Sequence, residues 1–521
     1  MEPVEQVGKL KPVKSSDFHK NISTVASGGG ITFIGKLFNN VIRLILAITL
    51  ARILGTVQLG YYSLALSALN ISMGIALFGL DAAIIRFIAV MRSREDEQNT
   101  WESIQVGMGI TLFLSTIIGI ALYSFSFYLA ENVFNNTDLT PYLQLVSVFV
   151  PLLVVNDQLS NAMKGFKQFN LSVLAQYVYQ PVTRLLLVGI LLLIGLNAKT
   201  AIASYALASL TASGAMIYFL NREFPLKRSF RVSYKILKEM VVFSVPVWLS
   251  SLLIQFQSNI QSIFIGSLDT IAGVGIFSVA SQITSVSGEF SSSINVTSKP
   301  IIAELHDKGD IKQMERIYQL VNKWVVIAQI PIFLVMVIFP KTLLSIFGED
   351  YTNGNIALII LAVGGLVKVG TGMGGIIIDM TGYTKLKLMN SILRLVAFIV
   401  LDLLLIPRWG LIGAAVAVLG GEGLVNILRL LEVYVIYKII PYNRSFYKPL
   451  IATFSAVGLV MLTRKFISPD TNYLYAGLNI GVMLLTYVAI ILLLRFTDEE
   501  IALYKTFTSS IKSKFRQNGG K

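Results

Sequence analysis

The chain has 521 residues, of which 54% are hydrophobic and only 14% are charged, and its mean hydropathy is +0.70. Soluble proteins have about 25% charged residues, so this composition excludes a string of soluble domains and indicates a membrane protein. The formal net charge is +14, but the basic residues gather in loops between apolar runs. That distribution excludes a separate nucleic-acid-binding domain.

The supply of metal-binding and catalytic side chains is small. Cysteine is absent, and the two histidines, His19 and His306, lie in polar segments. Disulfide bonds and thiolate metal sites are therefore excluded, and an imidazole-rich metal centre is not expected. The acids near the predicted outer loops form no cluster that would supply a general acid and base. We expect no catalytic residues, no metal site and no cofactor, and we consider only H⁺ or Na⁺ as a coupling ion.

Long apolar runs indicate where the transmembrane helices lie along the chain. A transmembrane helix needs about 20 residues, whereas membrane barrels show segments of about ten residues with alternating polarity. Residues 1–26 are polar and are expected to form a cytoplasmic tail before a retained first helix. The predicted helices cover residues 27–54, 58–90, 102–129, 140–163, 169–196, 200–221, 237–265, 270–300, 318–340, 354–380, 384–406, 410–437, 447–465 and 473–496. The second and eighth exceed one span, so we expect them to tilt, bend or extend beyond the membrane.

The distribution of basic residues predicts the topology. With the N-terminus inside, six of the 43 lysines and arginines lie on the outer side and seven lie within spans, which leaves 30 on the inner side. An excess of positive loops marks the cytoplasmic side. We therefore expect a multi-pass plasma-membrane protein with both termini in the cytoplasm. The basic tail at 497–521 fits a solvated segment and an interfacial helix equally well.

A short internal repeat divides the helices into two groups. The segment GYYSLA at residues 60–65 returns as GIFSVA at 275–280, and GFK at 165–167 is echoed by GYT at 382–384. Two echoes at nearly one offset predict an all-α polytopic protein with two pseudo-symmetric six-helix lobes, at 27–222 and 223–437. Two further helices at 438–496 bring the expected total to about fourteen. Parallel repeats of this kind place a transport site between the lobes, near the membrane midplane.

Matched polar stripes occupy the first helix of each predicted lobe. Ionisable residues inside spans are costly, so they normally face protein or a water-filled cavity. The first helix carries Lys36, Asn40 and Arg43 on one face, and the seventh carries Ser251, Gln255 and Ser258 at equivalent positions. The stripe is cationic in the first lobe and neutral in the second. Lys36 could instead extend its ammonium group to the inner interface.

Other polar residues within spans are candidates for binding, coupling or gating. Arg184, with Pro181 next to its helical turn, and Arg394 are further cations deep in predicted helices. Glu289 stands among hydroxyl side chains and must be neutral, paired or hydrated, so coupling and structural roles are both open for it. Four more charged residues are candidates for gates or scaffold: Asp81, Arg86, Asp157 and Lys368.

Three short segments in the first two predicted helices resemble a known family. The segments LARILG at 50–55, LGYYSLA at 59–65 and FGLD at 78–81 are similar to those of polysaccharide transporters. That family includes flippases of O-antigen and other lipid-linked oligosaccharides and belongs to the multidrug/oligosaccharidyl-lipid/polysaccharide superfamily. The similarity runs from about residue 27 to residue 496. The motifs do not indicate which sugar is carried.

The resemblance implies two lobes around a central cavity and a polyprenyl-phosphate or pyrophosphate substrate. Such a substrate would be flipped from the cytoplasmic to the outer leaflet by alternating access. Its partners would be membrane lipids and the glycosyltransferases or polymerase of the same pathway, and we expect a monomer. By position in the lobes, the resemblance assigns the anionic head group to a set of cavity residues: Lys36, Asn40, Arg43, Arg184, Arg394, Gln255 and Ser258.

Two alternative functions were weighed. An ion-coupled multidrug exporter of the same superfamily usually has acids in its first or seventh helix, where this chain has bases and, at the start of the seventh, only Glu239. Arg43 would also repel a cationic drug. A membrane glycosyl-transfer enzyme would need clustered acids or metal ligands, and the chain has no phosphate-cradling P-loop. The flippase reading is therefore preferred.

Overall fold

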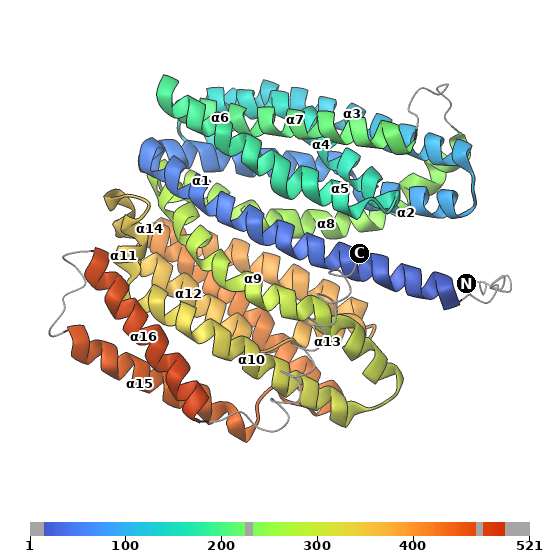
Figure 1. The fold of residues 1–521 in the computed structure, drawn as a ribbon. Helices are drawn as coiled ribbons and strands as arrows, with labels where there is room; N and C mark the ends of the chain where they lie inside the picture. The colour runs from blue at the N-terminus through green and yellow to red at the C-terminus, as the bar shows by residue number, and fades with distance from the viewer. Residues whose placement is uncertain (1–14, 225–232, 465–472, 495–521) are drawn as a thin grey trace. The chain divides into compact units, whose positions relative to one another are not determined.

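A computed structural model describes residues 15–224, 233–464 and 473–494, which form helices and no strand (Figure 1). The first part contains α1 (Ser15–Leu77), α2 (Leu80–Ser93), α3 (Glu97–Tyr128), η1 (Leu129–Val133), η2 (Thr137–Leu139), α4 (Thr140–Gly165), α5 (Phe169–Val173), η3 (Leu174–Tyr179), α6 (Gln180–Ile194) and α7 (Ala198–Glu223). The rest contains α8 (Tyr234–Leu268), α9 (Ile271–Asp307), α10 (Ile311–Ile338), α11 (Pro340–Ser345), η4 (Glu349–Gly354), α12 (Asn355–Gly370), α13 (Gly374–Met380), α14 (Thr384–Tyr437), η5 (Arg444–Phe446), α15 (Tyr447–Arg464) and α16 (Tyr473–Leu493). The predicted all-α class is confirmed.

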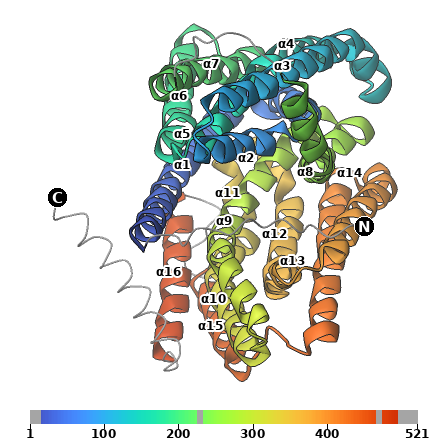
Figure 2. The same cartoon turned by 90° about the vertical axis from the view of Figure 1, so that its right-hand side faces the viewer.

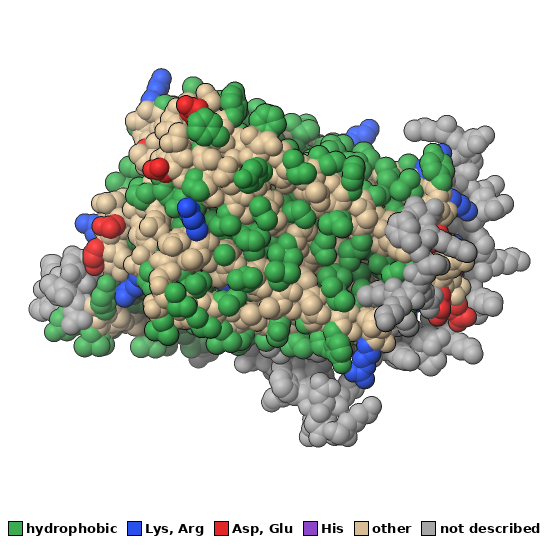
Figure 3. Space-filling view, turned by 90° about the horizontal axis from the view of Figure 1, so that it is seen from above, with side chains coloured by type: hydrophobic (Ala, Val, Ile, Leu, Met, Phe, Trp, Pro, Cys, Tyr) green, Lys and Arg blue, Asp and Glu red, His purple; other side chains and the backbone are tan. Residues whose placement is uncertain are grey.

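The helices have the length and surface of membrane spans. Among the described residues, 12 are long and apolar enough to cross a membrane. Two of these, α1 and α14, each consist of two helical stretches joined at a non-helical glycine, Gly55 and Gly410. The total of about fourteen stays a prediction. Large apolar side chains such as Leu193, Phe454 and Leu485 point outward, and hydrophobic side chains cover most of the face in Figure 3. The chain is a multi-pass membrane protein.

Polar caps start several helices at the ends of these apolar runs. Asn197 and Thr200 form a capping box at the start of α7. The hydroxyl of Thr270 accepts a bond from the backbone N–H of Gly273 at 3.0 Å, and Asp310 does the same for Gln313. These bonds satisfy backbone donors that a first helical turn leaves open. They explain why α9 and α10 begin where they do.

Contacts divide the chain into two compact units. Unit 1 comprises Met1–Leu54 and Tyr61–Ile260, and unit 2 comprises Gly55–Gly60 and Gln261–Lys521. Most of α8 therefore belongs to unit 1. The lobe boundaries predicted at 222 and 437 stay predictions.

Unit 1 is built around α4. This helix packs against α2, α3 and α7, and α6 packs on α7 (Figure 1). Its inner core joins Ile84 and Ile88 of α2 to Leu159 and Met163 of α4 and to Met216 of α7. A second core between α2, α3 and α8 contains residues such as Phe87 and Met240. The first core fixes α2 against the last third of α4, and the second fixes the start of α2 against α3 and α8.

Unit 2 has two apolar cores. One joins α10 to the paired helices α15 and α16 and includes Ile330, Val460 and Tyr487 (Figure 2). The other joins α9, α10, α13 and α14 around the fully buried Tyr318. The hydroxyl of Tyr318 donates to the backbone oxygen of Thr371 at 3.1 Å. That bond ties α10 to the break between α12 and α13.

The two copies of the repeated segment approach each other at their first residues, Gly60 and Gly275, which both belong to unit 2. A Cβ atom added to Gly60 would lie 1.9 Å from the backbone oxygen of Ile271, and one added to Gly275 would lie 2.1 Å from that of Thr56. The two contacts are equivalent under the offset of the repeat, because Thr56 and Gly60 shifted by 215 residues give Ile271 and Gly275. The contact is therefore reciprocal, and only glycine lets the two backbones approach so closely.

Candidate functional site

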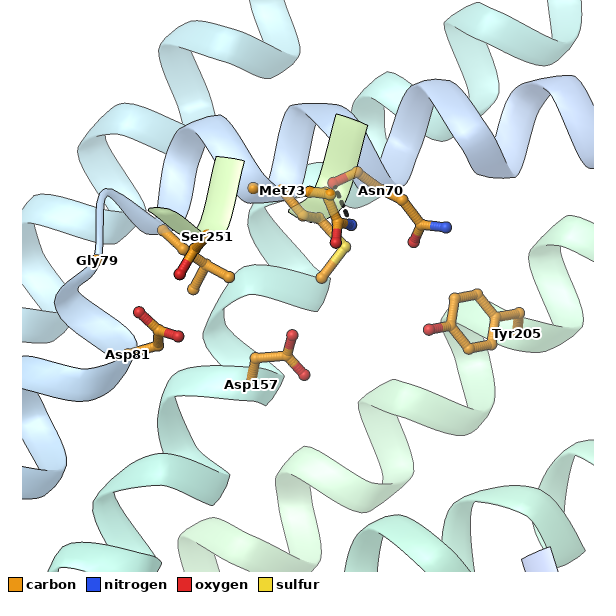
Figure 4. A pocket seen from close by; sticks show the side chains of 10 residues that line it. Asn70, Met73, Gly79, Asp81, Asp157, Tyr205 and Ser251 are labelled. Atoms are coloured by element: carbon orange, nitrogen blue, oxygen red, sulfur yellow. Dashed lines mark hydrogen bonds between the residues drawn. The ribbon is translucent and has the colours of Figure 1, made fainter. Parts of the chain in front are cut away.

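A polar cavity of about 240 Å³ lies inside unit 1. Five elements contribute to its wall: the second stretch of α1, α2, α4, α7 and α8. The lining residues are Asn70, Met73, Gly74, Leu77, Gly79, Asp81, Asp157, Tyr205, Ser251 and Gln255. In Figure 4 the carboxylates of Asp81 and Asp157 and the hydroxyl of Tyr205 are directed towards the same space. We call this space the unit 1 cavity.

A break in the backbone places Asp81 at the cavity. Phe78 and Gly79 have φ values of 48° and 70°, which end α1 and allow α2 to start in a new direction. A Cβ atom on Gly79 would lie 2.3 Å from the backbone oxygen of Ser244, so a larger residue would push α8 away. The expected bend in the second predicted helix is thus confirmed. Asp81 occupies the first turn of α2, where the helix dipole favours an acid.

Asp157 enters the cavity from α4, opposite Asp81. Two carboxylates in one membrane cavity repel each other unless a cation balances them. Lys164, about two turns further along α4, lies within electrostatic reach of both acids and of Lys36. One oxygen of Asp81, Oδ1, is buried and has no hydrogen-bond partner among the described residues. The acid pair is therefore partly balanced and keeps an unused acceptor.

Amide side chains organise the opposite wall. The side-chain amide of Gln255 donates to the backbone oxygen of Asn70 at 2.9 Å, the bond drawn in Figure 4. Asn70 in turn donates to Asn259 at 3.3 Å, and Asn259 donates to the backbone oxygen of Gln255 at 2.9 Å. This closed set of bonds joins the second stretch of α1 to α8, the helix that carries the second predicted polar stripe.

Arg184 is held by two tyrosines next to the cavity. Its guanidinium donates to the hydroxyl of Tyr62 and lies 5.0 Å from the ring centroid of Tyr205. The π-helical turn at Leu174–Tyr179 precedes α6 and shifts the face on which Arg184 projects; such turns are frequent at functional sites. Gln180 donates to Ser209 at 2.6 Å and ties the same turn to α7.

Tyr205 connects the cations to the acids. It lines the cavity, and it lies within electrostatic reach of Asp157 and of two cations, Arg184 and Arg43. Arg43 and Lys36 project from the first stretch of α1 and are exposed, while Asn40 between them is half-buried. We call Arg43, Arg184 and their tyrosine partners the cationic cluster. The structure thus brings five predicted residues together in unit 1: Arg43 and Arg184 in the cationic cluster, and Asp81, Asp157 and Gln255 at the cavity.

Two other predicted residues of this unit have different surroundings. The hydroxyl of Ser258 is exposed and donates to the backbone oxygen of Ile254 in its own helix at 2.9 Å. Such bonds satisfy a hydroxyl without a ligand. The guanidinium of Arg86 lies 4.5 Å from the ring centroid of Phe243, a cation–π contact that suits a scaffold role.

Unit 2 holds the remaining predicted residues. Arg394 pairs with Glu422 at 3.2 Å. Lys368 is exposed in the last turn of α12, where a cation is favoured by the helix dipole. The side chain of Glu289 lies outside the described residues, so its coupling role stays a prediction.

Several residues of the site were not predicted from the sequence. Tyr62 and Tyr205 position Arg184, Asn70 anchors Gln255, and Lys164 balances the acids. Tyr62 lies within the repeated segment and Lys164 follows the polar run around Asp157, so these two had a weak signal. Tyr205 is one of 21 tyrosines and had none.

The site combines two kinds of chemistry. Guanidinium groups bind phosphate oxygens bidentately, and they do so more strongly where water is scarce. Carboxylates, amides and hydroxyls around the cavity accept and donate hydrogen bonds to polar, hydroxyl-bearing groups. A ligand with both an anionic group and many hydroxyls would match this arrangement.

Comparison with known proteins identifies the family. A family model described as polysaccharide biosynthesis protein matches residues 25–306, more than half of the chain, and the MatE family model matches residues 246–404. The capsular polysaccharide biosynthesis protein CapF of Staphylococcus aureus is 24% identical over 336 residues, which cover 63% of this chain and 80% of that protein.

Two further similarities extend over more of the chain. A probable low-salt glycan biosynthesis flippase, Agl15 of Haloferax volcanii, is 24% identical over 397 residues, 75% of this chain and 77% of that protein. The solved structure of the lipid II flippase MurJ in an inward closed conformation superposes with a TM-score of 0.71 at 14% identity, covering 88% of this chain and 97% of that one. The resemblance found in the motifs is confirmed: the chain belongs to the family of polysaccharide biosynthesis proteins.

Proposed function

We propose that this protein flips a polyprenyl-phosphate- or pyrophosphate-linked oligosaccharide from the cytoplasmic to the outer leaflet by alternating access. Relatives named as a glycan flippase and as a capsular polysaccharide protein support a flippase and not an enzyme. The product would serve the synthesis of cell-surface polysaccharide or glycan. Membrane lipids and the glycosyltransferases or polymerase of the same pathway are the expected partners, and the expected state is a monomer.

The observation that carries this proposal is the cationic cluster beside the unit 1 cavity. Arg184 is fixed by Tyr62 and Tyr205, and Arg43 lies within reach of the same tyrosine. The cluster suits the phosphate of a carrier lipid. The adjoining acids, amides and hydroxyls suit the sugar. A lipid-linked oligosaccharide offers both groups on one molecule.

An ion-coupled multidrug exporter is the second candidate, because the MatE family model matches part of the chain. The acids of the cavity, Asp81 and Asp157, would suit a cationic drug. However, Lys164 lies within electrostatic reach of both acids, and Arg43 and Arg184 lie within reach of Tyr205, which lines the same cavity. These cations lower the attraction for a cationic drug and raise it for an anion, so the flippase is favoured.

Removal of single cations tests the proposal. In proteoliposomes that contain a fluorescent undecaprenyl-pyrophosphate-linked oligosaccharide, Arg184→Ala should lower the flipping rate about tenfold or more, because a charge-assisted bond contributes about 1.5–3 kcal/mol. Arg43→Ala should lower the rate as well. Lys199→Ala is the matched control, since this exposed lysine contacts Tyr142 away from the cavity. Well-folded Arg184→Ala protein with wild-type rates would contradict the role of the cluster.

The plasma membrane and cytoplasmic termini are proposed from the excess of positive inner loops. The absence of cysteine makes single-cysteine labelling clean. In intact cells, a membrane-impermeant maleimide should label Asn353→Cys, which is in a predicted outer loop, and should spare Lys308→Cys. Both parent side chains are exposed. The opposite labelling pattern would reverse the proposed orientation.

A further inference from the structure

Arg394 and Glu422 face each other deep within α14. Arg394 belongs to the stretch before Gly410 and Glu422 to the stretch after it, and both lie well inside the candidate span Thr384–Tyr437. Nη1 of Arg394 is 3.2 Å from Oε1 of Glu422, and each side chain is 19% exposed. The ion pair is therefore deep in the membrane region and still reachable by a ligand.

The distance between the two groups of this pair is typical of a contact that a ligand can displace. Charge-assisted N–H···O bonds are usually about 2.7–2.9 Å long, and arginine binds carboxylates best through two parallel bonds. The bond between Arg394 and Glu422 is longer than that. A buried ion pair contributes little net stability compared with apolar side chains, and ionisable residues within spans commonly mark substrate pathways. Stability alone does not explain why this pair is present.

Glu422 has a second hydrogen-bond partner, which would keep its carboxylate in place while Arg394 binds another group. The side-chain amide of Asn426 donates to Oε2 of Glu422 at 3.2 Å and to the backbone oxygen of the same residue at 2.8 Å. Asn426 is buried. The carboxylate could leave the guanidinium and keep this hydrogen bond, which lowers the cost of separation.

The other acids near Arg394 have partners of their own, so Glu422 is the acid that pairs with Arg394. Glu432 accepts a bond from Asn390 at 2.8 Å, and Asp379 pairs with Lys387 at 3.0 Å. Arg429 lies within electrostatic reach of Arg394, Glu422, Glu432 and Asp379. Arg429 therefore adds a second positive charge next to Arg394. An anion that arrives at Arg394 would be attracted by both guanidinium groups.

We propose that Glu422 is an internal competitor of the substrate, which occupies Arg394 until the phosphate of the carrier lipid displaces it. This inference rests on the proposed flippase function and adds a residue that tunes affinity. A phosphate can bind the guanidinium through two oxygens, so it can replace the 3.2 Å contact with Glu422 by a bidentate one. When the phosphate leaves, Glu422 returns, and the return favours release.

Binding of a simple probe tests the exchange. The full chain in phosphatidylcholine nanodiscs is titrated with undecaprenyl phosphate, and undecaprenol serves as the uncharged control. Glu422→Gln should bind undecaprenyl phosphate about tenfold more tightly than wild type, because the competing charge is gone. Arg394→Ala should bind it more weakly, and the double variant should show no gain. Glu349→Gln, which changes an exposed acid of η4, is the matched control and should leave the affinity unchanged.

The outcomes separate this inference from the proposed function. If wild type prefers undecaprenyl phosphate to undecaprenol but Glu422→Gln binds it equally or less tightly, Glu422 is scaffold and the inference is overturned alone. If wild type shows no preference for the phosphate, the anionic head-group role fails and this inference fails with it. Should Glu422→Gln not fold, Glu422→Asp keeps the charge but withdraws the carboxylate. Its affinity should rise by a smaller factor, and an unchanged affinity would overturn the inference.

Discussion

Arg184 shows how the fold prepares one side chain for an anion. Its charge would be costly within a span if it stood alone. The hydroxyl of Tyr62 accepts one of its hydrogen bonds, and the ring of Tyr205 offers a face to the guanidinium. Both tyrosines are neutral, so they position the group without cancelling its charge. Arg394 differs because Glu422 already neutralises it.

Tyr62→Phe tests this positioning. The variant removes the acceptor for Arg184, so we expect a loss of about 1 kcal/mol in the free energy of unfolding together with a several-fold lower flipping rate. Tyr61→Phe is the control, because the hydroxyl of Tyr61 donates to Asn136 at 3.2 Å and does not touch Arg184. It should show a similar loss of stability with the flipping rate retained. Equal rates in the two variants would mean that Tyr62 is only structural.

The sequence indicated single charged residues of the site more readily than the residues that they contact. Lys36, Arg43, Arg184 and Arg394 stand out because charge is rare in apolar runs. The partners Tyr62 and Glu422 are 122 and 28 residues away from the arginines that they contact. Which residues meet across helices depends on rotation and packing, which a single sequence does not encode in its periodicity. For this reason Arg394 was predicted as a cavity cation without its partner Glu422.

Glycine determines how the helices approach and bend. Gly79 lets α2 start against α8, and Gly410 divides α14 where the carboxylate of Asp269 accepts a bond from the backbone of Leu411. The reciprocal contact of Gly60 and Gly275 brings the two copies of the repeated segment together. The repeat was visible in the sequence, but its two copies were not expected to touch.

Gly275→Ala tests the reciprocal contact. The added Cβ would lie 2.1 Å from the backbone oxygen of Thr56, so the helices must move apart at a cost of about 1–3 kcal/mol. Gly458→Ala in α15 is the control, since its Cβ would meet nothing within 4 Å. That change should be neutral or stabilising by up to about 1 kcal/mol. Thermal unfolding in detergent measures both, and equal midpoints would show that the close approach is not required.

At the scale of the whole molecule, composition and periodicity predicted the membrane class and most helix bounds. The long apolar runs leave few alternatives, because backbone groups in lipid must be satisfied within each segment. The breaks at Phe78 and at Thr371, which separate α1 from α2 and α12 from α13, were not located in advance. They depend on close packing against other helices, as Gly79 against α8 and Gly372 against Tyr318 illustrate.

The charge balance around the site distinguishes a flippase from a drug exporter. Acids alone would favour a cation, and the cations around the unit 1 cavity shift the preference to an anionic lipid. The distinction therefore depends on the summed charge of the site and not on one residue. The sequence alone indicated a cationic site through the first helix. The structure adds Lys164 within electrostatic reach of both acids and places Arg184 against Tyr205, which lines the cavity.

Substrate choice in proteoliposomes tests the central claim most directly. Wild-type protein is reconstituted with fluorescent undecaprenyl-pyrophosphate-linked oligosaccharide in one leaflet, and a parallel sample contains a cationic dye. We predict protein-dependent movement of the lipid to the opposite leaflet and no transport of the dye. Transport of the dye with the lipid left in its original leaflet would contradict the account.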